Sequence, residues 1–210
     1  MTEINKTLIN LKSFFDQRAI LYGPVFQSVD WNSLERQYAI FNQLLKIWVN
    51  PKDSSSILDF GCGYGALLDY ISSKNFNFNN YLGYDISQIM IDNALKTHCQ
   101  QPNIFFSTEA KYLCQADYVI ASGIISMKMD SEDAEWEEYI FKTLSQLWEL
   151  SKKGLAFNSL TIYSDLKKMR PDLYYADPCR IFDFCKKHFS KNVALLHDYE
   201  LYEFTILVRK

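Results

Sequence analysis

The apolar residues in the first fifty positions recur with a helical period. Between residues 3 and 21 they fall every three or four positions, at Ile4, Leu8, Leu11, Phe15 and Ala19. Such spacing places apolar side chains along one side of a helix and leaves the other side polar. We therefore predict a first helix over residues 3–21 that packs its apolar stripe against the rest of the chain.

A second helix is predicted over residues 33–49. A Gly-Pro pair interrupts the first pattern, and Asn32 is followed three residues later by Glu35, a spacing typical of a capped helix start. Pro51 comes after the predicted helix and disfavours its continuation. The first fifty residues are thus expected to form a helical segment that precedes the main fold.

From residue 56 onwards, short apolar segments alternate with amphipathic ones. The apolar segments are typical of buried strands and occupy residues 56–60, 81–85, 103–108, 116–122 and 154–160. Helical patterns separate most of them, and a further helix is expected to begin at Asp177-Pro178, because Asp caps helices and Pro suits the first helical position. Strands that alternate with crossover helices form a parallel sheet.

The last twenty residues depart from this alternation. Two apolar segments, 191–200 and 201–210, follow each other without room for a crossover helix, so they are expected to pair as an antiparallel hairpin. The sequence therefore predicts an α/β fold with a doubly wound, mostly parallel sheet that ends in an antiparallel hairpin strand. A chain of 210 residues suits one compact domain of this kind.

Composition narrows the class of protein. Apolar residues make up 48% of the chain, which is enough for a large core and too many for a disordered chain. The formal net charge of −3 argues against a broad basic face for nucleic acid. The longest apolar runs are far shorter than the roughly 20 residues that a membrane helix needs.

Cysteine usage and the start of the chain indicate a cytoplasmic protein. The cysteines form an odd set without a CxxC pair, at Cys62, Cys99, Cys114, Cys179 and Cys185. No charged-then-apolar signal segment opens the chain. We therefore expect reduced thiols in a cytoplasm.

The strongest chemical signal is a glycine-rich turn between a predicted strand and a predicted helix. In ILDFGCGYGALLDYI the strand leads into Gly61, Gly63 and Gly65, and Ala66 completes a GxGxxA pattern. Glycines let the backbone turn tightly and let a ligand approach it closely. A ligand is therefore expected at this turn, and the pattern alone fits dinucleotides as well as other nucleoside cofactors.

Two acidic residues bear on the choice between NAD and S-adenosylmethionine. Asp85 ends the next predicted strand, where a carboxylate can accept hydrogen bonds from the ribose that NAD and S-adenosylmethionine share. Asp59 comes two residues before the first glycine, where a carboxylate repels a pyrophosphate but attracts an ammonium or a sulfonium. Asp59 and the terminal hairpin, rather than Asp85 or the glycines alone, therefore favour S-adenosylmethionine, and a NAD(P)-dependent oxidoreductase is the alternative.

Three segments together resemble a known family. ILDFGCGYG, YLGYDIS and ADYVIASGI are similar to successive signature segments of class I S-adenosylmethionine-dependent methyltransferases, and the terminal hairpin extends the likeness to residue 210. The resemblance implies a Rossmann-like sheet of seven strands in which only the last runs antiparallel. It also implies S-adenosylmethionine as the cofactor and methyl transfer as the activity.

The same resemblance implies which residues surround the methionine part of the cofactor. They are the glycine turn and its acid, namely Asp59, Gly61, Cys62, Gly63 and Gly65. Ser122 and Gly123, which follow the fourth strand, would lie beside the transferable methyl group.

Around the adenosine part, the resemblance places Asp85 on the ribose and Ile86 against the adenine. Glu109, with Ala110 beside it, stands where many relatives place an Asp near the adenine amino group. Glutamate has the longer side chain, so the sequence departs from the family pattern at this position.

Further segments resemble a bacterial subgroup of small methyltransferases, among them YGPVFQSVDWNSLERQYAIFNQLL and YYADPCRIFDFC. This likeness implies that residues 1–50 form a helical lid, with Tyr22 and Gln37 folded over the cofactor, on a methyltransferase domain of residues 51–210. A lid would exclude water from the reacting groups.

Candidates for acceptor activation are sought at the carboxyl ends of the strands, because open parallel sheets bind ligands there. His197 follows the penultimate strand and can exchange protons near neutral pH, so it is a candidate base, with a structural histidine at the turn as the alternative. Asn158 and Tyr163, at and after the fifth strand, are candidates for orienting the acceptor.

The sequence favours a small-molecule acceptor. Its histidines and cysteines show no zinc-type spacing, so no metal is expected. Its Lys pairs are spread out, and the fourth strand is followed by ASGI, unlike the Asn/Asp-Pro-Pro-aromatic segment that enzymes methylating exocyclic base amines resemble, so nucleic acid is not the expected partner. We expect methyl transfer to an oxygen or nitrogen of a metabolite or saccharide precursor, with a non-catalytic cofactor-binding or scaffold protein as a further alternative. The sequence specifies neither the acceptor nor the oligomeric state.

Overall fold

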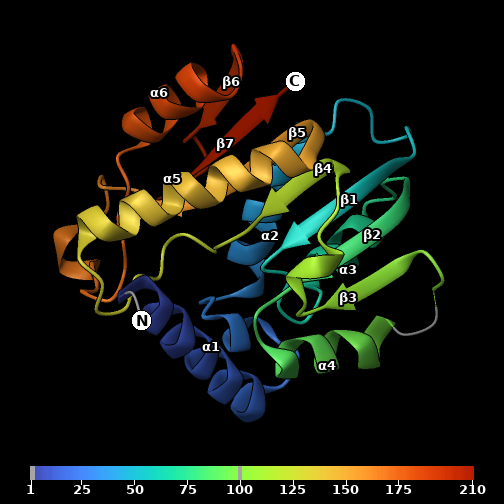
Figure 1. Ribbon diagram of the computed structural model, residues 1–210, viewed down its shortest axis with the longest axis horizontal. Coiled ribbons are helices and arrows are strands. Elements are labelled where there is room, and N and C mark those ends of the chain that lie inside the picture. The colour runs from blue at the N-terminus through green and yellow to red at the C-terminus, as the bar shows by residue number, and fades with distance from the viewer. Residues whose placement is uncertain (1–2, 99–100) are drawn as a thin grey trace.

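A central sheet of seven strands organises the computed structural model, which describes residues 3–98 and 101–210 (Figure 1). The strands are β1 (Ser55–Phe60), β2 (Phe78–Tyr84), β3 (Ile104–Ser107), β4 (Ala116–Ala121), β5 (Ser151–Leu160), β6 (Asn192–Leu196) and β7 (Glu203–Arg209). Their order is β3-β2-β1-β4-β5-β7-β6, and β7 runs antiparallel to both of its neighbours while the other pairings are parallel. The predicted α/β fold with an antiparallel last strand is confirmed.

Helices cover both faces of the sheet because successive strand residues point to opposite sides. On one face, Ile57 of β1 packs with α2 (Leu34–Leu44), α3 (Ala66–Ser73) and α4 (Gln88–His98). On the other face, Leu58 packs with α5 (Asp133–Leu150) and α6 (Pro178–His188). Both side chains are at most 1% exposed, and burial of each contributes about 1.5–3 kcal/mol.

The second predicted helix begins and ends differently from the prediction. Ser33, not Asn32, caps α2, because Ser33 is extended and its Oγ accepts the N–H of Arg36 at 3.2 Å. The helix then tightens into the 3₁₀ turn η2 (Leu45–Ile47) and stops before Trp48. Trp48 is buried against Phe76 and Tyr118, with ring centroids 5.2 and 5.3 Å away. Packing of this ring against the sheet, rather than Pro51, ends the helix.

The first predicted helix is present as α1 (Glu3–Tyr22), which lies beyond the carboxyl ends of the parallel strands (Figure 1). Its Thr7 hydroxyl hydrogen-bonds the Ser131 hydroxyl before α5, at 2.5 Å. Its Asp16 accepts the Ser87 hydroxyl before α4, also at 2.5 Å. These contacts fasten α1 across the edge at which ligands bind in open parallel sheets.

The start of α6 agrees with the sequence. Asp177 caps this helix by accepting the N–H groups of Cys179 and Arg180, at 2.8 and 3.3 Å, and Pro178 is its first residue. None of the helices in the described part of the chain combines the length and the apolar character that crossing a membrane requires. The described cysteines are all free thiols, and Cys99 lies outside the described residues.

Candidate active site

The glycine-rich turn joins β1 to α3 and is tied to the end of β2. The N–H groups of Gly61 and Cys62 both donate to the carbonyl oxygen of Tyr84, at 2.7 and 3.0 Å. Gly61 has a φ of 82°, in the left-handed region that favours glycine. A β-carbon at this position would also overlap Cγ2 of Ile124. Conformation and space both exclude a side chain there.

Asp85 follows β2 and holds the turn from the other side. Its carboxylate accepts the N–H groups of Gly63 and Ser87, each at 2.9 Å. Burial raises the pKa of Asp85, and these two hydrogen bonds oppose the rise. Each carboxylate oxygen retains capacity to accept a further hydrogen bond from a ligand.

Asp59 lies in β1 beneath the turn and is 1% exposed. The Tyr81 hydroxyl in β2 donates to its carboxylate at 2.5 Å. Burial raises the pKa of Asp59 to about 7, although this hydrogen bond lowers it. A cation placed next to Asp59 would favour the charged carboxylate.

The Cys62 thiol is buried beside these acids. Burial raises the pKa of Cys62 well above its usual value, and the nearby charges of Asp59 and Asp85 raise it further. The thiolate is the reactive form of cysteine. Cys62 therefore remains a neutral thiol that gives the turn its shape and supplies no nucleophile.

Ser122 and Gly123 follow β4 at the same edge of the sheet. The Ser122 hydroxyl is buried and has no hydrogen-bond partner among the described residues. The Gly123 N–H donates to Oδ1 of Asn158 at 2.9 Å, and Nδ2 of Asn158 donates to Glu203 at 2.5 Å. An unsatisfied buried hydroxyl costs about 1–3 kcal/mol, so a ligand that bonds Ser122 recovers that cost.

Three neighbouring cavities open around these residues. The glycine-turn cavity, of about 30 Å³, is lined by Asp59 and Gln37 among others. The apolar cavity, of about 240 Å³, contains Asp85 and is otherwise lined mainly by hydrophobic side chains such as Ile86. The charged cavity, of about 450 Å³, has cationic and anionic side chains on its walls, namely Arg36, Lys168, Arg170, Asp30 and Glu203.

The cavities share walls. Gly61 and Ser122 border both the glycine-turn cavity and the apolar cavity. Gly123 borders both the apolar cavity and the charged cavity. Val29 and Trp31 border all three. A ligand in the apolar cavity is therefore next to a ligand in the charged cavity, with Gly123 beside both.

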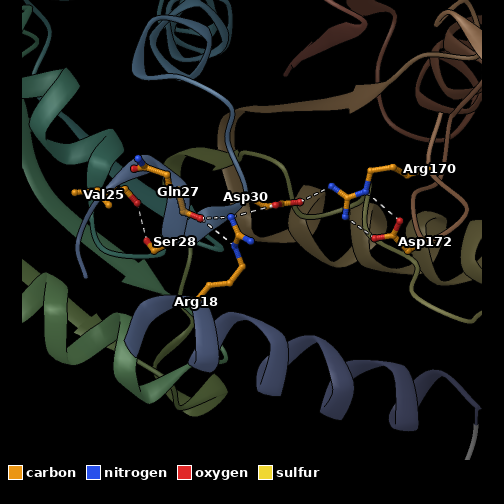
Figure 2. A network of polar contacts seen from close by, with 7 residues as sticks. All are labelled: Arg18, Val25, Gln27, Ser28, Asp30, Arg170 and Asp172. Atoms are coloured by element: carbon orange, nitrogen blue, oxygen red, sulfur yellow. Dashed lines mark hydrogen bonds and ion pairs between the residues drawn. The ribbon is translucent and has the colours of Figure 1, made fainter. Parts of the chain in front are cut away.

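The wall segment, residues 26–31, is held in place by a charge network (Figure 2). Its Asp30 lies between two guanidinium groups, 3.2 Å from Arg18 in α1 and 3.0 Å from Arg170 in the connection between β5 and α6. Arg18 also donates to the carbonyl oxygen of Gln27, and Arg170 also pairs with Asp172. Helix α1 and the connection between β5 and α6, which are distant in the sequence, thus both contact Asp30, the residue between Val29 and Trp31.

The structure divides the site residues predicted from the sequence into two groups. Those that line the cavities are Gln37, Asp59, Gly61, Cys62, Asp85, Ile86, Ser122 and Gly123. Those that line none of the three are Tyr22, Gly63, Gly65, Glu109, Ala110, Asn158, Tyr163 and His197. Within the second group, Gly63 and Asn158 still act on the site through their hydrogen bonds to Asp85 and to Gly123.

Several members of the second group lie at the surface. Glu109 is exposed and forms an ion pair with Lys111 at the surface. Ala110 begins the exposed 3₁₀ turn η3 (Ala110–Tyr112). Tyr22 is 43% exposed, with the Arg18 guanidinium 5.1 Å from its ring centre.

His197 follows β6 at the carboxyl edge, as expected, but it is exposed and away from the cavities. Its ring lies 6.0 Å from that of Tyr163 and 6.1 Å from that of Phe204, measured between ring centroids. Among residues 3–98 and 101–210, no group of three or more His, Cys, Asp or Glu side chains is placed to hold a metal ion.

Glu203 lines the charged cavity but is not among the site residues predicted from the sequence. It is the first residue of β7, and it pairs with Leu160 at the end of β5. Because β7 runs antiparallel, its first residue lies at the same edge as the last residues of the parallel strands. The signal was present in the sequence: an acid that opens the last strand of a terminal hairpin.

Comparison with known proteins identifies the family. A family model described as a methyltransferase domain matches residues 33–203. A Mycobacterium tuberculosis protein named as a methyltransferase, Rv1506c, is 52% identical over 162 residues, which are 77% of this chain and 97% of that protein. The chain therefore belongs to the methyltransferase domain family.

Solved structures of other methyltransferases share the fold. Magnesium protoporphyrin IX methyltransferase from Synechocystis PCC 6803, solved with bound SAH (S-adenosylhomocysteine), superposes with a TM-score of 0.66 at 15% identity and covers 96% of this chain and 99% of that one. The N-methyltransferase NodS of Bradyrhizobium japonicum superposes with a TM-score of 0.61 at 14% identity, over 86% of this chain and 98% of that one.

These findings confirm the class that the sequence predicted. The family match and the sheet topology identify an S-adenosylmethionine-dependent methyltransferase with a Rossmann-like fold. Between the two cofactors that the glycine pattern left open, they decide for S-adenosylmethionine and against NAD(P).

Proposed function

We propose that the protein transfers a methyl group to an oxygen or nitrogen of a small molecule that occupies the charged cavity. The observation that carries this proposal is the shared border at Gly123, which places that cavity next to the apolar one. Its volume of about 450 Å³ lies within the range of about 300–1,000 Å³ that is typical of small-molecule sites.

The residues at the glycine turn fit the methionine part of S-adenosylmethionine. The buried carboxylate of Asp59 suits an ammonium group, which would favour its charged form. The unpartnered Ser122 hydroxyl offers a hydrogen bond that no described residue takes up. Gly61 leaves its side of the turn free of a side chain.

The residues of the apolar cavity fit the adenosine part. Asp85 can accept hydrogen bonds from ribose hydroxyls while it keeps its bonds to Gly63 and Ser87. Ile86 and the other hydrophobic side chains suit the faces of an adenine ring. When bound, the cofactor supplies an electrophilic methyl group on a sulfonium.

The chain's own contribution to the reaction is to bind, to align and to exclude water. An acceptor lone pair forms the new bond to the methyl carbon as the carbon–sulfur electron pair returns to sulfur, so alignment decides the rate. A proton must also leave the acceptor atom, which calls for a base within hydrogen-bond reach. Val29 and Trp31 close the site on the side of the wall segment.

The fold by itself does not select the acceptor atom. Structures that share it include the N-methyltransferase NodS and the carbon methyltransferase CurJ. Charged side chains at the walls, including Arg36 and Glu203, support a polar acceptor that carries exchangeable protons, and therefore oxygen or nitrogen.

Residues 1–50 support the proposed lid. Helix α1 is fastened across the carboxyl edge, and the wall segment that follows it borders all three of the cavities described above. Gln37 from α2 accepts the Tyr64 hydroxyl at 3.2 Å beside the glycine turn. This arrangement supports a lid that the N-terminal segment forms over both proposed binding regions.

The test is a search for the acceptor with S-adenosylmethionine that carries a radiolabelled methyl group. The enzyme is incubated with a bacterial metabolite extract freed of macromolecules and, separately, with protein and nucleic acid from the same cells. We expect the label to enter a small molecule, and Asp85→Ala to reduce this at least tenfold through weaker cofactor binding. Asp92→Ala, on the exposed side of α4, is the matched control. Label confined to protein or nucleic acid would contradict the proposal.

A further inference from the structure

We infer that Glu203 accepts the proton that the acceptor loses, so that the acceptor presents a hydroxyl or an amine to this carboxylate. The inference rests on the proposed function and adds a catalytic residue to it. In the balanced step, the acceptor lone pair forms its bond to the methyl carbon, the carbon–sulfur bond breaks with its electron pair going to sulfur, and the proton of the acceptor O–H or N–H passes to a Glu203 oxygen. The proton then leaves Glu203 to water through the charged cavity.

The position of Glu203 carries the inference. Its side chain borders the charged cavity, and its carboxylate accepts Nδ2 of Asn158 at 2.5 Å. The other end of the same amide accepts the N–H of Gly123, at 2.9 Å. One side chain thus links the carboxylate to the residue that borders both the acceptor and the cofactor regions. Asn158 acts as a positioning residue for Glu203.

The surroundings keep Glu203 available as a base. Burial raises the pKa of Glu203 to about 7, while the hydrogen bond from Asn158 and the positive charge of Arg36 lower it. The groups that face it are Arg36 from α2, Asn158 from β5 and Tyr199 from the β6–β7 connection. No Lys, Arg or His within the described residues forms an ion pair with it. A base works best when its pKa lies near the working pH.

Other candidates for this role are less well placed. Asp30 is the second carboxylate that borders the charged cavity, but it is already paired with two guanidinium groups, those of Arg18 and Arg170. His197 borders none of the three cavities and lies at the surface. Among the described residues, Glu203 alone combines a place in the charged cavity with a carboxylate that forms no ion pair with a cation.

The first test needs no acceptor. Protein labelled with ¹³C in its Glu carboxyl groups is titrated by NMR with S-adenosylhomocysteine bound. We expect one signal to titrate near pH 7 and to be missing from Glu203→Gln, whose amide oxygen can still accept from Asn158. Glu138→Gln, an exposed variant in α5, should keep that signal. If no Glu carboxyl titrates between pH 6 and 8, the inference is overturned, whether or not an acceptor is known.

The second test uses the acceptor found by label transfer. Glu203→Gln should lower kcat/KM by about 10²–10⁴ and should remove the fall in rate below about pH 7, because the fall reports protonation of the base. Affinity for S-adenosylhomocysteine should stay within twofold of the wild type. The assignment would be overturned if Glu203→Gln keeps the fall in rate below about pH 7. It would also be overturned if this variant loses affinity for S-adenosylhomocysteine as strongly as it loses turnover. Loss of that fall in His197→Ala alone would transfer the role to His197.

Discussion

The proposed cofactor region, which comprises the glycine-turn and apolar cavities, and the proposed acceptor region, the charged cavity, are built in different ways. In the cofactor region the polar side chains Asp59, Asp85 and Ser122 lie in or directly after β1, β2 and β4, while α1, the wall segment and α5 complete the walls. The charged cavity collects Arg36, Arg170 and Glu203 from separate parts of the chain. Chemistry that resides in one strand and its loop can be inferred from sequence, whereas chemistry assembled from distant segments requires the fold.

The two regions also differ in polarity. Asp85 is the single acid among the hydrophobic side chains of the apolar cavity. The charged cavity has three cationic side chains and two carboxylates. We expect a nucleoside to be held in the apolar cavity mainly by hydrophobic contacts, and a polar acceptor to be oriented by the charged side chains of the charged cavity. Substitutions can therefore be chosen to affect one region and spare the other.

The largest effect on the cofactor region alone is expected from Gly61→Ala. Alanine at this position would have to keep a positive φ, which strains a residue that has a β-carbon. Its methyl group would also overlap Ile124. We expect affinity for S-adenosylhomocysteine, measured by calorimetry, to fall about 100-fold, which corresponds to about 2.7 kcal/mol.

Gly23→Ala is the matched control for backbone strain. Gly23 has a φ of 70°, but nothing lies within 4 Å of an added β-carbon. This variant should lower the melting temperature and leave the affinity within threefold of the wild type. If both variants weaken binding equally, general backbone strain explains the loss of affinity. The overlap of the added β-carbon at position 61 with Ile124 then does not explain it.

An intermediate effect, with a dependence on pH, is expected from Asp59→Asn. Because burial raises the pKa of Asp59 to about 7, the folded chain retains a proton that the unfolded chain releases near pH 4. The free energy of unfolding of the free enzyme therefore falls as the pH rises from about 4 to 7. Asn does not ionise, so it removes this loss. We therefore expect the free energy of unfolding of Asp59→Asn at pH 8, measured by urea denaturation, to exceed that of the wild type by about 1–3 kcal/mol.

The same substitution should weaken the cofactor region. Asn can still accept the Tyr81 hydroxyl, but it does not attract an ammonium group, so affinity for S-adenosylhomocysteine at pH 8 should fall about tenfold. Glu203 contributes a pH dependence of the same sign and remains in the variant. A variant that is neither more stable nor a weaker binder would show that Asp59 is protonated in the complex as well.

The smallest effect is expected from Asp30→Asn, which loosens the wall that both regions share. Partly exposed ion pairs contribute about 0.2–1 kcal/mol each, so release of S-adenosylhomocysteine in stopped-flow measurements should be about three times faster at low salt. The difference should vanish near 1 M salt, where such pairs are screened.

Asp183→Asn breaks an exposed ion pair with Lys187 on α6 and serves as the control for a general loss of surface charge. It should leave the release rate unchanged at every salt concentration. Equal acceleration in both variants would mean that the wall segment has no special part in retaining ligands.

Much of the fold could be predicted because its signals are local. The alternation of strands and helices, the Asp177 cap and the close-spaced terminal hairpin each depend on a few consecutive residues. The start of α2 was misplaced by one residue because Asn32 and Ser33 are both good caps, and only the Ser33 hydroxyl reaches a free N–H. The end of α2 depends on burial of Trp48 against β4, which no local pattern encodes.

The site was likewise predictable only where its residues lie in local sequence motifs. Asp59, Gly61 and Asp85 lie in motifs with their own backbone geometry, and all three border a cavity. His197 was chosen for its chemistry and its place after a strand, but the turn after β6 carries it to the surface. Glu203 enters the site because β7 reverses direction, which is a property of the hairpin and not of the residue.

The border at Gly123 has a consequence for inhibitor design. A single compound that joins an adenosine-like group to an acceptor-like group would occupy the two adjacent cavities, with Gly123 beside both of its halves. Joining the two groups raises the effective concentration of the second once the first has bound, so the tethered molecule should bind far more tightly than either half. The linker can be short, because the two cavities share Gly123 as a wall residue.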